Sequence, residues 1–256
     1  MGKGSVSRRV ELKSPAEIEK MRKAGRLLRQ VFDAVGAMVA PGVTTRELDR
    51  EAYRLITEGG ARPAFLGYHD YPATLCTSVN DEIVHGIPND RPLQSGDIVS
   101  VDAGLVLDGY YADTATTFAV GEISEEARLL LKVTEESLKK AIEKVQPGGR
   151  LGDISATIQQ YVESFGFSVV RDYTGHGIGR ALHEPPQVPN YGKPSTLDRL
   201  RPGLVLAIEP MVNIGTEKTI VLDDGWTVKT ADGSLSAHFE HTVAVTESGP
   251  YILTAN

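Results

Sequence analysis

The stretch DIVSVDAGLVLDGYYADTATTFAV, residues 97–120, carries the strongest fold signal in this sequence. Two runs rich in β-branched and aromatic residues flank Asp108 and Gly109, and an Asp-Gly pair in this setting is typical of a two-residue hairpin turn. Such a turn makes Leu107 and Tyr110 the first paired residues. The stretch therefore predicts an antiparallel hairpin at this point of the chain.

This pairing would bring two aspartates to one face of the hairpin. Asp102 would lie opposite Ala115, and Asp113 opposite Gly104. Because side chains alternate between the two faces of a strand, the two acids become diagonal neighbours within reach of one ion. The small residues opposite them would leave room for that ion. Taken alone, the pair also allows a second interpretation, in which one aspartate caps a turn.

Two helical patterns precede the hairpin. In residues 15–36 apolar side chains recur at three- and four-residue steps, and Ser14 followed by proline is typical of a helix start. A Pro-Gly pair at Pro41 ends this pattern. A second amphipathic pattern follows, with Thr44 or Thr45 as its N-cap.

The second half of the chain repeats this order. Residues 125–145 have a helical pattern, Pro147 and a glycine break the chain, and residues 154–165 are helical again before further strand-like runs. Pro41 and Pro147 are 106 residues apart. The repeated order indicates an internal duplication, with a chance recurrence of helices and strands as the alternative.

The acids keep nearly the same spacing. Asp102 and Glu209 are 107 residues apart, whereas Asp113 and Glu240 are 127 apart, so the second half holds an insert of about 20 residues that includes Trp226. Two units of a helix pair and a sheet, related by a pseudo-twofold axis, predict an α+β fold with a central antiparallel sheet flanked by helices. Equivalent strands would then bring their ligands together near the axis.

Four acids and one histidine form the predicted metal site. Glu209 follows an apolar run and Glu240 precedes one, and the duplication matches them to Asp102 and Asp113. A buried carboxylate without a partner is very costly. Two divalent cations would balance the charge of four carboxylates, and His176, beside two glycines, can add a neutral nitrogen ligand.

Two other motifs in this region resemble sites of different chemistry, but neither fits the pattern that such a site requires. The segment at residues 175–179 resembles a phosphate-binding loop, but its glycines do not have the dinucleotide spacing and no helical pattern follows. His183 and Glu184 begin like a zincin helix, but the two prolines after them forbid a helix. His85 and His183 lie in loops rich in glycine and proline, where functional residues concentrate.

The composition indicates a soluble globular protein. The net charge of −7 gives no basic surface for nucleic acid or an anionic membrane, and no run approaches the ~18 apolar residues that cross a bilayer. The single cysteine, Cys76, fits a reducing compartment, and the N-terminus lacks the apolar core of a secretory signal. We expect a cytoplasmic protein with a loose tail over residues 1–10 and one catalytic domain over residues 11–256.

Six motifs in this order resemble the methionine aminopeptidases, in their compact bacterial form. They are NDEIVHGIP, VSVDAG, YADTA, GHGIGRALHEPPQVPNYG, LAIEPM and HFEHT. The resemblance runs from Ser14 to Thr254. It implies the "pita-bread" α+β fold, in agreement with the pseudo-twofold axis. It also implies hydrolytic removal of the initiator methionine from chains with a small second residue and a free, deformylated amine.

The resemblance also assigns roles to the acids and histidines. Asp113 and Glu240 would bridge two divalent ions, which would be manganese, iron, cobalt or zinc. The remaining ligands implied are Asp102 on one ion and His176 and Glu209 on the other. The family's two active-site histidines that bind no metal correspond to His85 and His183, which would contact the substrate and the tetrahedral intermediate. Glu209 could also carry a proton to the leaving amine.

The methionine pocket implied by the resemblance is apolar and partly aromatic. Its residues would be Phe65, Tyr68, Tyr71, Cys76, Leu182, Met211 and Trp226. Phe65 and Leu182 differ from the usual bacterial pattern, which has cysteine and phenylalanine there, so the preferences for the methionine and the next residue stay open. His238 lies two residues before Glu240 and so on the same strand face, which allows it to support a ligand.

The expected partners are the N-termini of nascent polypeptides, with a transient ribosome contact as an option, and we expect a monomer. Proline-specific relatives on the same fold usually carry an extra N-terminal domain, for which this chain has no room. A type II methionine aminopeptidase would need a helical insert between His183 and Glu209, which are only 26 residues apart. A metal-free binding module of the same fold would have lost ligands, and all five are present here.

Overall fold

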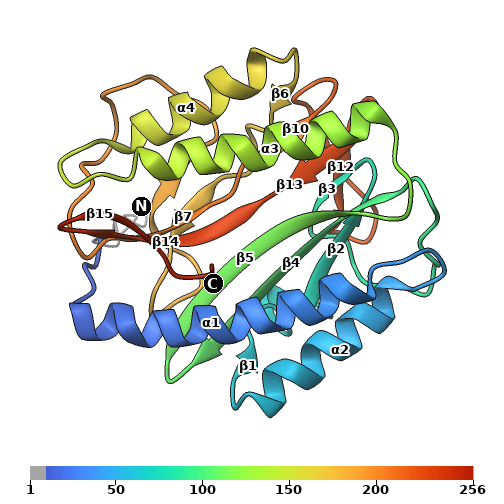
Figure 1. Cartoon of the computed structure of the whole chain (residues 1–256), viewed down its shortest axis with the longest axis horizontal. Helices are drawn as coiled ribbons and strands as arrows, with labels where there is room; N and C mark the ends of the chain where they lie inside the picture. Colours follow the sequence, from blue (N-terminus) through green and yellow to red (C-terminus); the bar gives the residue numbers. More distant parts are fainter. Residues whose placement is uncertain (1–9, 256) are drawn as a thin grey trace, which may run out of the picture.

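The computed structural model describes residues 10–255, so the predicted tail, apart from Val10, lies outside the described residues. One large sheet carries two helix pairs (Figure 1). In this view α1 and α2 run along the lower side and α3 and α4 along the upper side, and β5 and β14 cross between them. The sheet takes strands from both halves of the chain.

The four α-helices found in residues 10–255 begin at N-caps that the local sequence provides. They are α1 (Pro15–Met38), α2 (Thr45–Glu58), α3 (Glu125–Glu143) and α4 (Leu151–Glu163), and a 3₁₀ turn, η1, covers Tyr68–Asp70. Ser14 and Thr44 each form a capping box with a glutamate three residues later. The helix α4 begins three residues earlier than predicted, because the Asp153 carboxylate accepts a hydrogen bond from the Arg150 N–H and closes its first turn.

Fifteen strands are described. They are β1 (Arg62–Pro63), β2 (Leu75–Val79), β3 (Glu82–Val84), β4 (Ile98–Leu107), β5 (Tyr110–Ala119), β6 (Ser168–Val169), β7 (Gly175–Gly177), β8 (Glu184–Val188), β9 (Val205–Ile208), β10 (Met211–Asn213), β11 (Thr219–Val221), β12 (Val228–Thr230), β13 (Ser236–His238), β14 (Glu240–Thr246) and β15 (Gly249–Ile252). The main sheet has the order β1-β4-β5-β14-β9-β7-β8, with β2 on β4 and β15 on β14. The hairpin β4–β5 of the first half thus lies beside the pair β14–β9 of the second half, as the duplication predicts.

The predicted hairpin register is confirmed. Leu107 pairs with Tyr110, and the pairing continues without a shift. The turn residues Asp108 and Gly109 both have positive φ, as a two-residue turn of this type requires.

The helices cover one face of the main sheet and leave the acids on the other. Alternate β4 residues, such as Val101 and Leu105, pack with α1 and α2, while the β14 residues Val243 and Val245 pack with α3. With a side-chain period of two, Asp102 then faces away from the helices. None of the helices in residues 10–255 has the length and apolar composition to span a bilayer.

The insert predicted in the second half forms a small hairpin. Strands β11 and β12 pair with each other, and β12 also pairs with β3, which immediately precedes His85. Trp226 lies in the turn before β12. The insert therefore brings Trp226 from the second half against a segment of the first half.

Candidate metal centre and active-site cavity

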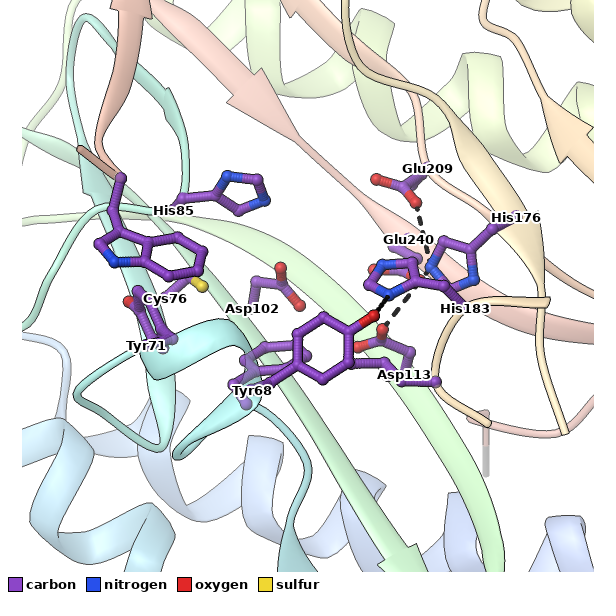
Figure 2. Close-up of a pocket in the computed structure, with 13 residues that line it drawn as sticks. Tyr68, Tyr71, Cys76, His85, Asp102, Asp113, His176, His183, Glu209 and Glu240 are labelled. Carbon is purple, nitrogen blue, oxygen red and sulfur yellow. Dashed lines mark hydrogen bonds and ion pairs between the residues drawn. The ribbon is translucent and has the colours of Figure 1, made fainter. Parts of the chain in front are cut away.

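Adjacent strands of the main sheet position the four predicted carboxylates. Asp102 on β4 and Glu240 at the start of β14 both pair with Ala115, one from each side of β5, and Asp113 lies two residues before Ala115 on β5. Glu209 directly follows β9, the strand that pairs with β14. All four acids face one space (Figure 2).

Gly104, opposite Asp113, is closely approached from three sides. A Cβ on Gly104 would lie 2.9 Å from Phe65 Cε1, 3.0 Å from Ala64 Cβ and 3.3 Å from Asp113 Oδ1. Glycine at this position therefore allows Phe65 to reach the cavity wall beside the Asp113 carboxylate. That the small residues opposite the acids leave room for an ion stays a prediction.

Burial dominates the electrostatics of the acids. It raises the pKa of Asp113 to about 7. The pKa of Asp102 is raised well above its usual range by burial and by the charges of Asp113 and Glu209. Burial and the neighbouring carboxylates raise the pKa values of Glu209 and Glu240 in the same direction. The protein alone thus disfavours the charged forms, and positive charge in the cavity would be needed to stabilise them.

His176 presents one nitrogen to these acids. Its Nδ1 lies 2.9 Å from the backbone oxygen of Gly177, which makes Nδ1 the protonated nitrogen and leaves the Nε2 lone pair free. Nε2 lies 3.6 Å from Glu209 Oε1 and 3.9 Å from Asp113 Oδ2. Burial lowers the pKa of His176 to about 3, so the ring is neutral near pH 7.

The donor set fits divalent metal. Ligand atoms of Asp113, His176 and Glu240 all lie within 4.8 Å of one another. Within residues 10–255, buried oxygens of Asp102, Asp113 and Glu240 have no hydrogen-bond partner. Buried carboxylate oxygens without donors are rare, and oxygen and imidazole ligands suit divalent cations.

One cavity of about 160 Å³ contains nearly all of the predicted site residues. Its lining consists of Phe65, Tyr68, Tyr71, Cys76, His85, Asp102, Asp113, His176, Leu182, His183, Glu209, Trp226 and Glu240. Asp113, Glu209, Glu240 and His176 lie on one side, Tyr71 and Cys76 lie on the other, and Asp102 lies between them (Figure 2). The cavity therefore joins a polar cluster to an apolar, partly aromatic wall.

Met211 is the exception, and its predicted place in the pocket is wrong. It does not line the cavity; it is fully buried among Ile83, Val84 and Val170. The reason is a break after Glu209, where Pro210 separates β9 from β10. Met211 consequently belongs to a second sheet, β13-β10-β6.

The apolar wall is held rigidly. The Tyr71 hydroxyl donates to the backbone oxygens of Leu75 at 2.9 Å and Gly86 at 3.0 Å, and its ring meets Trp226 edge-on with centroids 5.0 Å apart. Cys76 on β2 lies directly opposite Asp102. Burial and the charge of Asp102 raise the pKa of its thiol, so Cys76 contributes a neutral, apolar surface.

His85 and His183 approach the cavity from loops. His183 is exposed, its Nδ1 lies 2.7 Å from the Tyr68 hydroxyl, and its ring centroid is 4.2 Å from that of His176. His85 has a φ of 61°, an uncommon conformation that functional sites often hold. Burial lowers the pKa of His85 to about 4, so it is neutral near pH 7.

His238 lies behind the acids. It is 1% exposed, and its Nε2 is 3.7 Å from Glu209 Oε2. Neither of its ring nitrogens has a hydrogen-bond partner in the part of the chain that the structure describes. Glu209 therefore has one oxygen toward His176 and the other toward His238.

Sequence reasoning missed two polar residues that hold the ligands. Thr242 Oγ1 accepts a hydrogen bond from the Asp113 N–H at 3.0 Å and donates to the Asp113 backbone oxygen at 2.7 Å. Asn190 Nδ2 donates to the backbone oxygen of Glu209 at 3.1 Å. Thr242 follows Glu240 by two residues on the same face, which is a usable signal, whereas nothing local marks Asn190.

Comparison with known proteins agrees with this geometry. Residues 19–247 match the model of metallopeptidase family M24. The chain belongs to this family. Within it, the chain groups with the methionine aminopeptidases: it is 56% identical to a methionine aminopeptidase of Clostridium perfringens over 95% of this chain and 98% of that protein. This M24 chain is therefore a metallopeptidase, and the family match indicates use of divalent metal.

Solved structures of family M24 members share the fold. The crystal structure of a methionine aminopeptidase from Thermotoga maritima superposes with a TM-score of 0.95 at 48% identity, covering 97% of this chain and 100% of that one. A prolidase from Pyrococcus furiosus gives a TM-score of 0.74 at 25% identity, covering 96% of this chain but 65% of the prolidase. The predicted pita-bread fold is confirmed.

Proposed function

We propose that this chain removes the N-terminal methionine from polypeptides that have a free α-amine and a small second residue. The observation that carries the proposal is the single cavity in which four carboxylates and His176 meet the wall formed by Tyr71, Cys76 and Trp226. The names of its relatives support methionine as the substrate residue. An unbranched thioether suits an apolar slot with aromatic edges.

The metal ligands in this proposal are five. They are Asp102, Asp113, His176, Glu209 and Glu240. We propose two ions rather than one, because four ionised carboxylates carry four negative charges, which two divalent cations balance. Divalent cations bound there supply Lewis-acid polarisation of the scissile carbonyl and a more acidic water.

The residues that bind no metal orient the substrate. Partial desolvation at the mouth of the cavity and the neighbouring His69 lower the pKa of His183, which favours its neutral form, and it can donate a hydrogen bond to the oxygen that gains charge as the carbonyl is attacked. His85 borders the same cavity and can hydrogen-bond the substrate backbone. Glu209 can hold the proton taken from water and return it to the leaving amine.

The α-amine explains why the enzyme would act only at chain ends. With the methionine side chain against the buried Tyr71 and Cys76, the α-amine lies beside the buried carboxylates, where an N-terminal extension would have to displace them or the metal. A free amine beside the carboxylates gains electrostatic stabilisation that an N-formyl group would lose. Prolidases share this fold, but no feature of the described cavity favours a proline-specific substrate.

The test is an assay of purified protein on Met-Ala-Ser, on Pro- and Leu-initiated peptides, and with a chelator. We expect cleavage of Met-Ala-Ser alone, its loss on chelation and its return with manganese or cobalt. Equal cleavage of a Pro-initiated peptide, or full activity in excess chelator, would contradict the proposal.

We further propose that the enzyme works as a monomer in the cytoplasm on nascent chains, with a transient ribosome contact. The single cysteine and the net charge of −7 support a reducing compartment and a soluble protein. Light scattering would give the oligomeric state, and cosedimentation with ribosomes over a range of salt concentrations would test the contact.

A further inference from the structure

A buried ion pair joins the start of the chain to the loop that carries His183. This loop, residues 178–183, connects β7 to β8 and is called the His183 loop below. Lys13 Nζ forms an ion pair with Glu184 Oε2, and the two side chains are only 4% and 11% exposed. The residues are 171 positions apart in sequence. Neither belongs to the cavity lining.

Glu184 also binds the backbone of the His183 loop. Its other oxygen, Oε1, accepts hydrogen bonds from the N–H groups of Arg180 at 2.7 Å and Ala181 at 3.1 Å. These two residues immediately precede Leu182 and His183, which both line the cavity. One carboxylate thus fixes the turn from which a pocket residue and an active-site histidine project.

Lys13 is itself held in place. Its N–H donates to the Gly203 backbone oxygen at 2.6 Å, and its Nζ also donates to the Glu11 backbone oxygen at 3.2 Å. A Cβ on Gly179 would lie 2.1 Å from Lys13 Cε, so the lysine stem crosses the loop where only glycine leaves space. The lysine therefore lies directly against the His183 loop.

We propose that Lys13 is a positioning residue for His183 and Leu182, acting through Glu184. A buried ion pair is a poor source of net stability, but removing one partner leaves an uncompensated charge that rearranges its surroundings. Here the surroundings are the His183 loop. The second ionic contact of the loop, Arg180 with Glu17 at 2.9 Å, involves an exposed side chain and is weakened by solvent. It cannot replace the buried pair.

The proposal rests on the proposed function of His183, and a double-mutant cycle tests it. Lys13→Met keeps the stem and removes the charge. With the metal-loaded enzyme and Met-Ala-Ser, we expect a kcat about tenfold lower, because small displacements of a positioned group are costly. In a His183→Ala background the same change should cost less than twofold, because the group it positions is gone. Equal losses in both backgrounds would overturn the proposal, as would an unchanged kcat for Lys13→Met.

A second variant and a second readout test the proposal even if Lys13→Met does not fold or the enzyme is inactive. Glu184→Gln, taken through the same cycle, decides the question if Lys13→Met does not fold. Hydrogen exchange of the Arg180 and Ala181 amides should speed up in Lys13→Met, and unchanged exchange would contradict the proposal even if the protein had no peptidase activity. Val133→Ala is the matched control for a general loss of stability, because it leaves a cavity in the core under α3. This variant should have a lower Tm but an unchanged kcat.

Discussion

Asp102 on β4 and Glu240 on β14 lie on either side of the same residue, Ala115 of β5. Adjacent strands are about 4.8 Å apart, so the two acids stand roughly 10 Å apart at their backbones with only a methyl group between them. Asp113 approaches the same space from β5 itself. Three neighbouring strands thus build a carboxylate cluster around one small side chain.

Removing Glu240 tests this cluster. In our assignment Glu240 would be one of the residues that hold the metal, so Glu240→Ala should abolish tight binding of manganese or cobalt as well as turnover. Titration calorimetry and metal analysis of the purified variant give the direct readout. Near wild-type turnover in this variant would contradict the dinuclear assignment.

His183→Ala should give a different result. Because His183 is no ligand in our assignment, the metal content should stay normal. The loss should appear in kcat, by roughly 10²–10³-fold, if His183 donates to the developing oxyanion. Loss of one metal equivalent would instead show that His183 is a metal ligand, and our division of the site into ligands and non-ligands would be wrong.

His238 is predicted to orient Glu209. Its Nε2 lies 3.7 Å from Glu209 Oε2, and a shift of less than about 1 Å would form a hydrogen bond. Groups that hydrogen-bond a metal ligand typically contribute roughly 10–100-fold to metal affinity or activity. His238→Leu should therefore lower the affinity for manganese at least about tenfold. His238→Gln retains an N–H donor and should recover most of the loss.

His241 provides the matched control for His238. It lies on the other face of β14, with Nδ1 2.9 Å from Thr254 Oγ1. His241→Leu should leave metal affinity unchanged, measured with manganese by calorimetry. An equal loss of affinity in His241→Leu and His238→Leu would show that the effect comes from disturbing the strands β13 and β14 beside the site rather than from the contact with Glu209.

The metal-free protein should lose stability as the pH rises toward neutrality. Burial raises the pKa of Asp113 from 3.8 to about 7, so its contribution to stability is full below 3.8, shrinks between 3.8 and about 7, and is gone above 7. Below about pH 6.5 the buried histidines act in the opposite direction, because His85 and His176 have lowered pKa values of about 4 and about 3. The effect of Asp113 is therefore unopposed by these histidines only between about pH 6.5 and about pH 7.

Thermal unfolding in chelator and in manganese checks this prediction. Without metal, Tm should fall between about pH 6.5 and about pH 7.5. With metal, Tm should hold or rise over the same range, because the ionised carboxylates then have a partner. A metal-free Tm that rises with pH in this window would mean that the acids are already ionised at neutral pH.

The parts of the site that depend on local sequence rules could be predicted from the sequence. Turn chemistry at Asp108 and Gly109 set the register of the β4–β5 hairpin, and alternation then put Asp102 and Asp113 on one face. Glu209 and Glu240 were reached only through the duplication, because no local rule links strands so far apart. Trp226 and Leu182 come from irregular segments without periodicity, and only the family resemblance pointed to them.

The errors and omissions have physical causes as well. Met211 was placed in the pocket only by the family resemblance, whereas the chain leaves the main sheet at Pro210 and Met211 belongs to another sheet. The small residue at Gly104 was interpreted as space for an ion, and nothing in the sequence indicates that Phe65 and Ala64, from a distant segment, approach it closely. The Lys13–Glu184 pair depends on a tertiary contact between distant segments, which no spacing in the sequence indicates.

The last prediction concerns the choice of substrate, and it follows from the shape of the cavity. Phe65, Tyr71, Cys76, Leu182 and Trp226 wall the end of a cavity of about 160 Å³, which suits an unbranched apolar side chain. In the proposed binding mode the second residue lies beside His85 and His183, which both line the cavity, so glycine, alanine, serine or cysteine should be accepted and leucine or lysine rejected. Each methylene-scale change in such a pocket is worth roughly 1–3 kcal/mol, so large second residues should lower kcat/KM by several orders of magnitude. The measurement is kcat/KM for Met-Ala-Ser, formyl-Met-Ala-Ser, Met-Leu-Ser and Leu-Ala-Ser under identical metal loading. Comparable values for Met-Ala-Ser and Leu-Ala-Ser would indicate a general leucine-type aminopeptidase, since the cavity would then not distinguish a thioether from a branched chain.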